Sequence, residues 1–182
     1  MTRLLLLLSL SLCCAGLVFA EEPPGKTPQD QFWASLQTLC GKNYLGEVQV
    51  NTSSTKMEGQ PRIEVKNCEA RRMEIAFHMG EDRSRTWILT RTGSGLRLKH
   101  DHRHEDGTPD KITNYGGDTY EIGQAGRQEF DVDDFTVKLV AGTDKNIWVF
   151  EIKPGQSLAY ELYKGKVKPV FRVAFNLGKA VN

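Results

Sequence analysis

From Tyr44 to the C-terminus, short segments of alternating apolar and polar residues are separated by turns rich in glycine and aspartate. Alternation of this kind places the apolar side chains on one face of a β-strand. The segments cover residues 46–52, 62–68, 73–79, 86–91, 96–104, 130–140, 147–152, 158–163 and 170–177. About nine or ten short strands at such spacing are typical of an all-β sandwich or barrel. Because no second helix is predicted between the strands, a parallel sheet is disfavoured.

One helix is predicted ahead of these strands. Thr27, Pro28 and Asp30 supply a capping residue, a proline at the first helical position and an acid in the first turn. The apolar residues that follow recur at helical spacing, and a glycine ends the helix: Phe32, Leu36 and Leu39, with Trp33 beside them, then Gly41. A helix that leads directly into antiparallel strands favours a closed β-barrel, since closure removes exposed edges. A two-sheet sandwich is the alternative.

The N-terminus has the features of an export signal. Arg3 precedes a leucine-rich stretch, and small residues end it at Ala20. We therefore assign residues 1–20 to a signal peptide, 21–26 to a polar tether and 27–182 to one barrel domain. No small residue precedes Cys13, so the sequence does not favour a lipid-modified cysteine.

Charge and cysteine content restrict the function further. Removal of Arg3 leaves 24 − 1 = 23 basic residues against 23 acidic ones, which indicates neither a nucleic acid nor an anionic membrane surface as partner. Only Cys40 and Cys68 remain after signal cleavage. In an exported protein they predict one disulfide, with two buried free thiols as the alternative.

Residues 32–48, which include Trp33, Gly41 and Tyr44, resemble the entry of calycin-type barrels, the lipocalin and fatty-acid-binding class. In that class a short helix caps one barrel end, and a glycine and a tryptophan begin the first strand. Gly41 and Tyr44 stand in these places, although their spacing departs from the class pattern. Residues 77–87 and 115–118 also resemble an uncharacterised family of small exported bacterial proteins, a resemblance that implies no activity.

Histidines are concentrated in the run Leu-Arg-Leu-Lys-His-Asp-His-Arg-His that begins at Leu96. In a regular strand, His100, His102 and His104 share a face with Leu96 and Leu98, while the charged residues between them face the other way. The imidazoles are therefore predicted to point toward the core. In the alternative, the strand frays into the acidic loop that follows, which leaves only His100 buried.

A second group of polar residues precedes the histidines. Arg83, Arg85 and Trp87 share one strand face, where two arginines near imidazoles could hold a carboxylate or a phosphate. Aromatic walls for such a pocket are offered by Trp87, Trp148, Tyr115, Tyr120, Tyr160 and Tyr163. The alternative is that the arginines form ion pairs with Glu81, Asp82 or Asp101.

Metal binding and catalysis are weaker hypotheses. Residues two apart on a strand are separated by about 6.6–6.8 Å, so a metal could use one pair, His100 and His102, with a further ligand such as His78. A histidine acid or base near Asp101 or Asp118 is the catalytic alternative. The acids at positions 131, 133 and 134 lack calcium-loop spacing and are predicted to form a solvated turn.

The sequence therefore favours a secreted or periplasmic protein, without enzymatic activity, that holds a small, partly polar or anionic molecule in a barrel pocket. The predicted lining residues are His100, His102, His104, Arg83, Arg85 and Trp87. The alternatives are a histidine-based metal or haem protein, an enzyme that uses a histidine acid or base, and an envelope protein-interaction module without a ligand. No particular cofactor is indicated.

Overall fold

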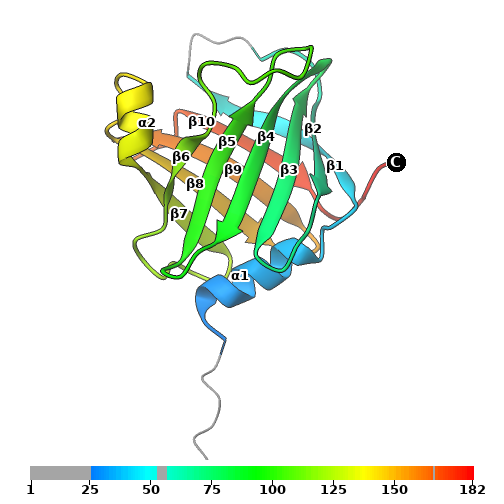
Figure 1. Ribbon diagram of the computed structural model, residues 1–182. Coiled ribbons are helices and arrows are strands. Elements are labelled where there is room, and N and C mark those ends of the chain that lie inside the picture. The colour runs from blue at the N-terminus through cyan, green and yellow to red at the C-terminus, as the bar shows by residue number, and fades with distance from the viewer. Residues whose placement is uncertain (1–25, 53–56, 166) are drawn as a thin grey trace, which may run out of the picture.

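The computed structural model describes residues 26–52, 57–165 and 167–182. These residues form ten strands and two helices: α1 (Pro28–Gln37), β1 (Asn43–Asn51), β2 (Pro61–Lys66), β3 (Arg72–Met79), β4 (Asp82–Arg91), β5 (Leu96–His102), β6 (Tyr115–Asp118), β7 (Arg127–Val132), α2 (Asp134–Leu139), β8 (Asn146–Lys153), β9 (Ser157–Lys164) and β10 (Phe171–Asn176). Each strand pairs antiparallel with its neighbours in sequence, and β1 also pairs with β10 (Figure 1). The predicted closed antiparallel barrel is confirmed, and the sandwich alternative is wrong because the β1–β10 pairing leaves no open edge.

The predicted signal peptide and residues 21–25 of the predicted tether lie outside the described residues. Neither helix of the described chain is long and apolar enough to cross a membrane.

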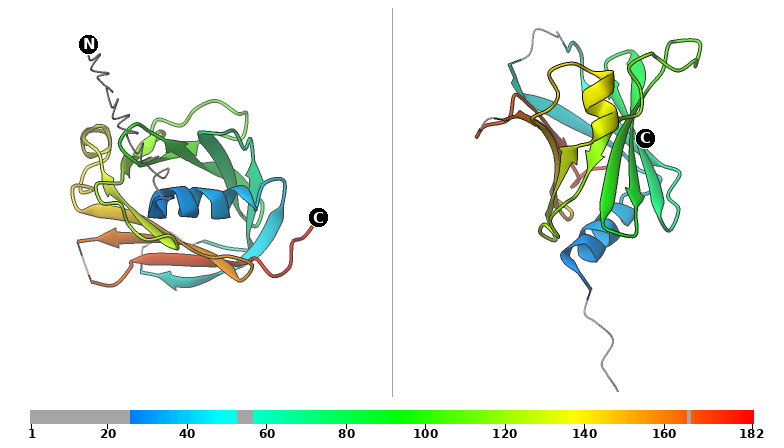
Figure 2. Two further views of the ribbon diagram at one scale, coloured as in Figure 1. Left: turned by 90° about the horizontal axis from the view of Figure 1, so that it is seen from below. Right: turned by 60° about the vertical axis from the view of Figure 1, so that its left-hand side comes forward.

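Helix α1 closes one end of the barrel (Figure 2). Thr27 and Asp30 form a reciprocal cap, in which each side chain accepts a hydrogen bond from the other residue's backbone N–H. Phe32, Trp33 and Leu36 are buried against the barrel interior. The predicted helix is confirmed, although it ends at Gln37, before Gly41.

A disulfide joins the exit of α1 to the turn after β2. Cys40 and Cys68 are 28 residues apart, and their Cα atoms lie 6.1 Å apart. The predicted pairing is therefore confirmed. A closed loop of this length restricts the unfolded chain and so stabilises the plugged end of the barrel.

Residues 130–140 were expected to be strand in pieces, with no second helix. Residues 130–132 are strand, at the end of β7, but residues 134–139 form α2, so the expectation is wrong for this part of the chain. Helix α2 forms because Asp133 caps it, accepting a hydrogen bond from the backbone N–H of Thr136 at 2.9 Å. Asp133 also pairs with Lys99, so it is not a solvated turn residue. The Thr136 hydroxyl in turn contacts the backbone of Gly116 at 2.7 and 2.9 Å, which fixes β6 where it enters the barrel wall.

The hydrophobic core fills the half of the barrel next to α1. Its largest fully buried side chains come from α1 and from the inward faces of the strands, among them Trp33, Phe32, Leu36, Met73, Ile75, Phe130 and Phe150. The other half is lined by rings and polar groups that leave space between them.

Candidate functional site

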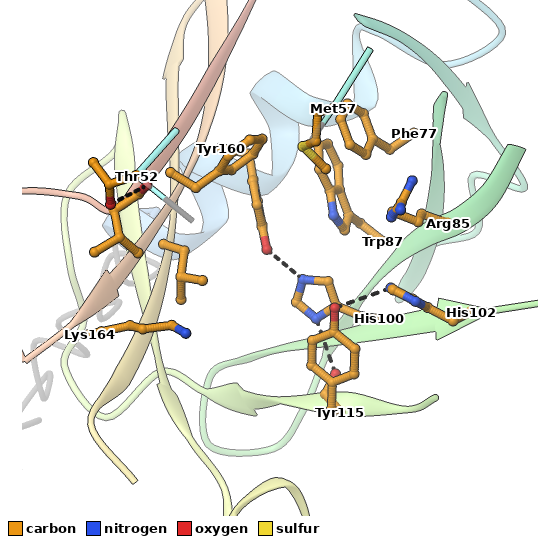
Figure 3. A pocket seen from close by; sticks show the side chains of 13 residues that line it. Thr52, Met57, Phe77, Arg85, Trp87, His100, His102, Tyr115, Tyr160 and Lys164 are labelled. Carbon is orange, nitrogen blue, oxygen red and sulfur yellow. Dashed lines mark hydrogen bonds between the residues drawn. The ribbon is translucent and has the colours of Figure 1, made fainter. Parts of the chain in front are cut away.

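A cavity of about 500 Å³ opens at the barrel end away from α1. Strand β1 runs from the α1 end toward this end (Figure 1). Thr52, which follows β1, and Lys164, which ends β9, both line the cavity. The cavity is lined from opposite sides of the barrel (Figure 3), mostly by strand residues and also by Thr52, Met57 and Val170, which lie outside the strands. The strand residues are Phe77, Arg85, Trp87, His100, His102, Tyr115, Tyr160, Leu162, Lys164 and Phe171.

Strand register places the predicted site residues beside one another. Trp87 on β4 is paired in register with His100 on β5, and Arg85 is paired with His102. His100 is also in register with Tyr115, the first residue of β6. Because residues in register share a face of the sheet, these five side chains form one continuous inner wall.

His100 is fully engaged by two partners. Its Nδ1 lies 3.1 Å from the backbone carbonyl oxygen of Tyr115, and its Nε2 lies 2.8 Å from the hydroxyl of Tyr160. A carbonyl oxygen only accepts, so Nδ1 carries the hydrogen. Burial lowers the pKa of His100 to about 3, which keeps the ring neutral and leaves Nε2 as an acceptor. The Tyr160 hydroxyl therefore donates to Nε2.

His102 and Tyr115 form a second pair nearer the mouth. The Tyr115 hydroxyl lies 3.1 Å from Nε2 of His102. Burial, and then the nearby Arg85 guanidinium, lower the pKa of His102, so this ring is also neutral at pH 7. Burial raises the pKa of Tyr115 to about 12, which keeps its phenol protonated. Either partner can be the donor, depending on which ring nitrogen carries the hydrogen.

Stacked rings hold the wall in place. Trp87 lies between Phe77 and Tyr160, with ring centroids 4.8 and 4.4 Å away and nearly parallel planes. His100 stacks on Tyr115 at 4.4 Å. Because both faces of the Trp87 ring are covered, its position and that of the Tyr160 hydroxyl are fixed together.

Two cationic side chains face the cavity from opposite walls. In the order of the strands around the closed barrel, β4 and β9 are five positions apart in both directions, so they lie on opposite sides. Arg85 on β4 and Lys164 on β9 therefore lie across the mouth from one another (Figure 3). Arg85 pairs with Asp82. Within the described chain, Lys164 has neither an ion pair nor a side-chain hydrogen bond. The mouth therefore offers positive charge to a bound molecule.

Two of the predicted lining residues do not reach the cavity. Arg83 and His104 instead line a separate surface depression. Strand β5 ends at His102, so His104 lies beyond the wall, and its side chain is 55% exposed. Arg83 lies beyond the last residues that β4 pairs with β5, and the register of β4 against β3 shifts between Arg85 and Asp82, so the alternation that turns Arg85 inward does not extend to Arg83. The four others, His100, His102, Arg85 and Trp87, are brought together.

His78, the further ligand suggested for a metal, lies away from the other histidines. It follows Phe77 on β3, and since Phe77 lines the cavity, His78 faces outward. Its Nδ1 lies 3.0 Å from a guanidinium nitrogen of Arg62. Among the described residues, no group of three or more His, Cys, Asp and Glu side chains is arranged to hold a metal ion.

Of the six aromatic residues suggested as walls, Trp87, Tyr115 and Tyr160 line the cavity, whereas Tyr120 is 76% exposed. Sequence reasoning missed Phe77, Phe171 and Lys164. Lys164 could have been found, since Tyr160, Leu162 and Lys164 alternate on β9 and so share its inner face.

Fold and site together define a class of protein, a closed ten-stranded antiparallel barrel with a helix at one end and an aromatic, imidazole-lined cavity at the other. Comparison of the chain with protein-family models, with curated proteins and with solved structures finds no match.

Proposed function

We propose that this protein binds a small organic anion with an apolar body, whose acidic group lies at the mouth beside Arg85 and Lys164. The observation that carries the proposal is the cavity of about 500 Å³ with aromatic walls and two cationic side chains. Pockets for small organic ligands typically enclose about 300–1,000 Å³ and combine apolar walls with a few placed polar groups. A guanidinium is well suited to bind a carboxylate, a sulfonate or a phosphate.

Export to an oxidising compartment is part of the proposal. The leucine-rich N-terminus supports it, and so does the Cys40–Cys68 disulfide, because disulfides persist mainly outside the cytosol. A helix at one barrel end and a cavity at the other are also compatible with the calycin-type resemblance of residues 32–48.

Replacement of Arg85 should weaken anion binding selectively. We expect anilinonaphthalenesulfonate to bind saturably to the mature protein and Arg85→Gln to weaken it about tenfold, the effect of losing one charge-assisted hydrogen bond. In this variant the Asp82 carboxylate has lost its Arg85 partner and repels the sulfonate of the probe. Phenylnaphthylamine has the same aromatic framework without the sulfonate, so its affinity should change less than about threefold. Fluorescence titration measures both.

Arg83→Gln is the matched control, since Arg83 lies two residues away on the same strand and outside the cavity. It should leave both affinities unchanged. Equal weakening by Arg83→Gln and Arg85→Gln, or the absence of saturable binding, would contradict the proposal.

A further inference from the structure

The hydrogen atoms around His100 have only one consistent arrangement. Moving the ring hydrogen from Nδ1 to Nε2 would place two lone pairs together across the 3.1 Å contact with the carbonyl of Tyr115. Adding a second hydrogen would charge a ring that is 2% exposed and has no acidic partner in the described structure. The hydroxyl hydrogen of Tyr160 is therefore committed to His100.

The Tyr160 oxygen consequently presents only lone pairs to the cavity. A phenol has one hydrogen to donate, and the 2.8 Å bond to Nε2 of His100 uses it. The His102–Tyr115 pair differs, because no side-chain partner is found for Nδ1 of His102 in the described chain and the ring can exchange its hydrogen. The Tyr160–His100 pair is thus a fixed hydrogen-bond acceptor toward the cavity. The Tyr115–His102 pair can instead serve as a donor or as an acceptor.

The Tyr160 acceptor and one of the two cations, Lys164, lie along the same wall. Tyr160 and Lys164 share the inner face of β9 and are four residues apart, which corresponds to about 13 Å along a strand. A molecule lying along this wall meets a hydrogen-bond acceptor at its inner end and positive charge at its outer end.

We propose that the natural ligand is an aromatic or similarly flat acid that carries a hydroxyl or N–H group at the end opposite its acidic group, and that this group donates a hydrogen bond to the Tyr160 oxygen. This inference rests on the proposed function and specifies its ligand class. In this role His100 is a positioning residue, because it acts through the Tyr160 hydroxyl, whose direction it sets.

Three naphthoates test the inference, with the carboxylate on one ring and a hydroxyl, a hydrogen or a methoxy group on the other. Near pH 7 the hydroxyl remains a donor, since phenols have a pKa of about 10. We expect hydroxynaphthoate to bind the mature protein about tenfold more tightly than methoxynaphthoate, with naphthoate between them. The methoxy oxygen can only accept, so it would place its lone pairs against those of Tyr160.

The variant His100→Leu distinguishes a positioning role of His100 from a merely structural one, because only a positioning role changes the relative affinities for hydroxynaphthoate and methoxynaphthoate. Without Nε2, the Tyr160 hydroxyl is free to donate into the cavity, so the hydroxy-to-methoxy affinity ratio should fall about tenfold. His78→Leu replaces a buried histidine that faces away from the cavity and should leave the ratio as in the wild type. Circular dichroism verifies that both variants are folded. If His100→Leu does not fold, the order in which the three naphthoates bind to the wild-type protein tests the donor requirement.

The outcomes separate this inference from the proposed function. If the naphthoates bind with equal affinity, or methoxynaphthoate binds best, the donor requirement is overturned while the anion site stands. If no naphthoate binds although anilinonaphthalenesulfonate does, the inference again fails alone. Failure of all these probes to bind overturns both.

Discussion

Replacing Trp87 with alanine is expected to lower the free energy of unfolding by about 3–5 kcal/mol, the range for truncating a buried tryptophan. Trp87 is 2% exposed and stacks on Phe77 and Tyr160 at once. Its loss frees the Tyr160 ring, so the bond to His100 should lose its fixed geometry. We therefore also expect the preference for hydroxynaphthoate to disappear. Urea unfolding and fluorescence titration measure the two effects.

Trp33→Ala is the matched control for this variant. Trp33 is 1% exposed and lies on α1, in the filled end of the barrel. Its removal should cost a similar free energy of unfolding and leave the preference among the naphthoates intact. If both variants change that preference equally, the aromatic stack does not position the cavity wall.

Acidification is expected to destabilise the protein through His100 in the window from about pH 6.5 to pH 3. The folded pKa is lowered to about 3, whereas an unfolded histidine titrates near 6.5, so in this window the unfolded chain binds the extra proton. Stability is thus complete above the unfolded pKa and is lost as the pH falls, by about 1.4 kcal/mol per pH unit. The hydrogen bond to the Tyr115 carbonyl favours the charged ring but does not outweigh the effect of burial on the pKa of His100, and His102 and Lys99 disfavour the charge.

Urea unfolding at pH 7 and pH 5 isolates this contribution. Between these values His100 should account for about 2 kcal/mol, most of which His100→Leu should remove. Burial lowers the pKa of His78 and His102 too, so the variant keeps part of the dependence. An identical loss of stability in the wild type and in His100→Leu would show that His100 is not buried as a neutral ring.

Local sequence pattern was enough to predict most strands, α1 and the inward direction of His100 and His102. It did not predict β6 (Tyr115–Asp118), whose two glycines have the composition of a turn. Alternation sets the face of each residue in a strand, and the leucines at positions 96 and 98 show which face is buried. Thr27 and Asp30 supply the helix cap from residues three apart in the chain. Such signals require no knowledge of distant partners.

The features that the sequence did not predict depend on contacts between residues far apart in the chain. At Arg83 the register of β4 against β3 shifts, which breaks the alternation, and His104 lies beyond the end of β5. Both features depend on how a strand pairs with its neighbour. Helix α2 is too short for periodicity to reveal it, and its capping acid also pairs with Lys99 from a strand more than thirty residues earlier. The stack of Phe77, Trp87 and Tyr160 joins β3, β4 and β9, a meeting that only barrel closure determines.

A crystal structure of the mature protein with hydroxynaphthoate tests the binding site most directly. We predict the naphthalene rings inside the barrel, the carboxylate within about 2.7–2.9 Å of Arg85 or Lys164, and the hydroxyl within hydrogen-bond distance of the Tyr160 oxygen. Hydroxynaphthoate bound on the outer face, with side chains filling the barrel end, would contradict the account.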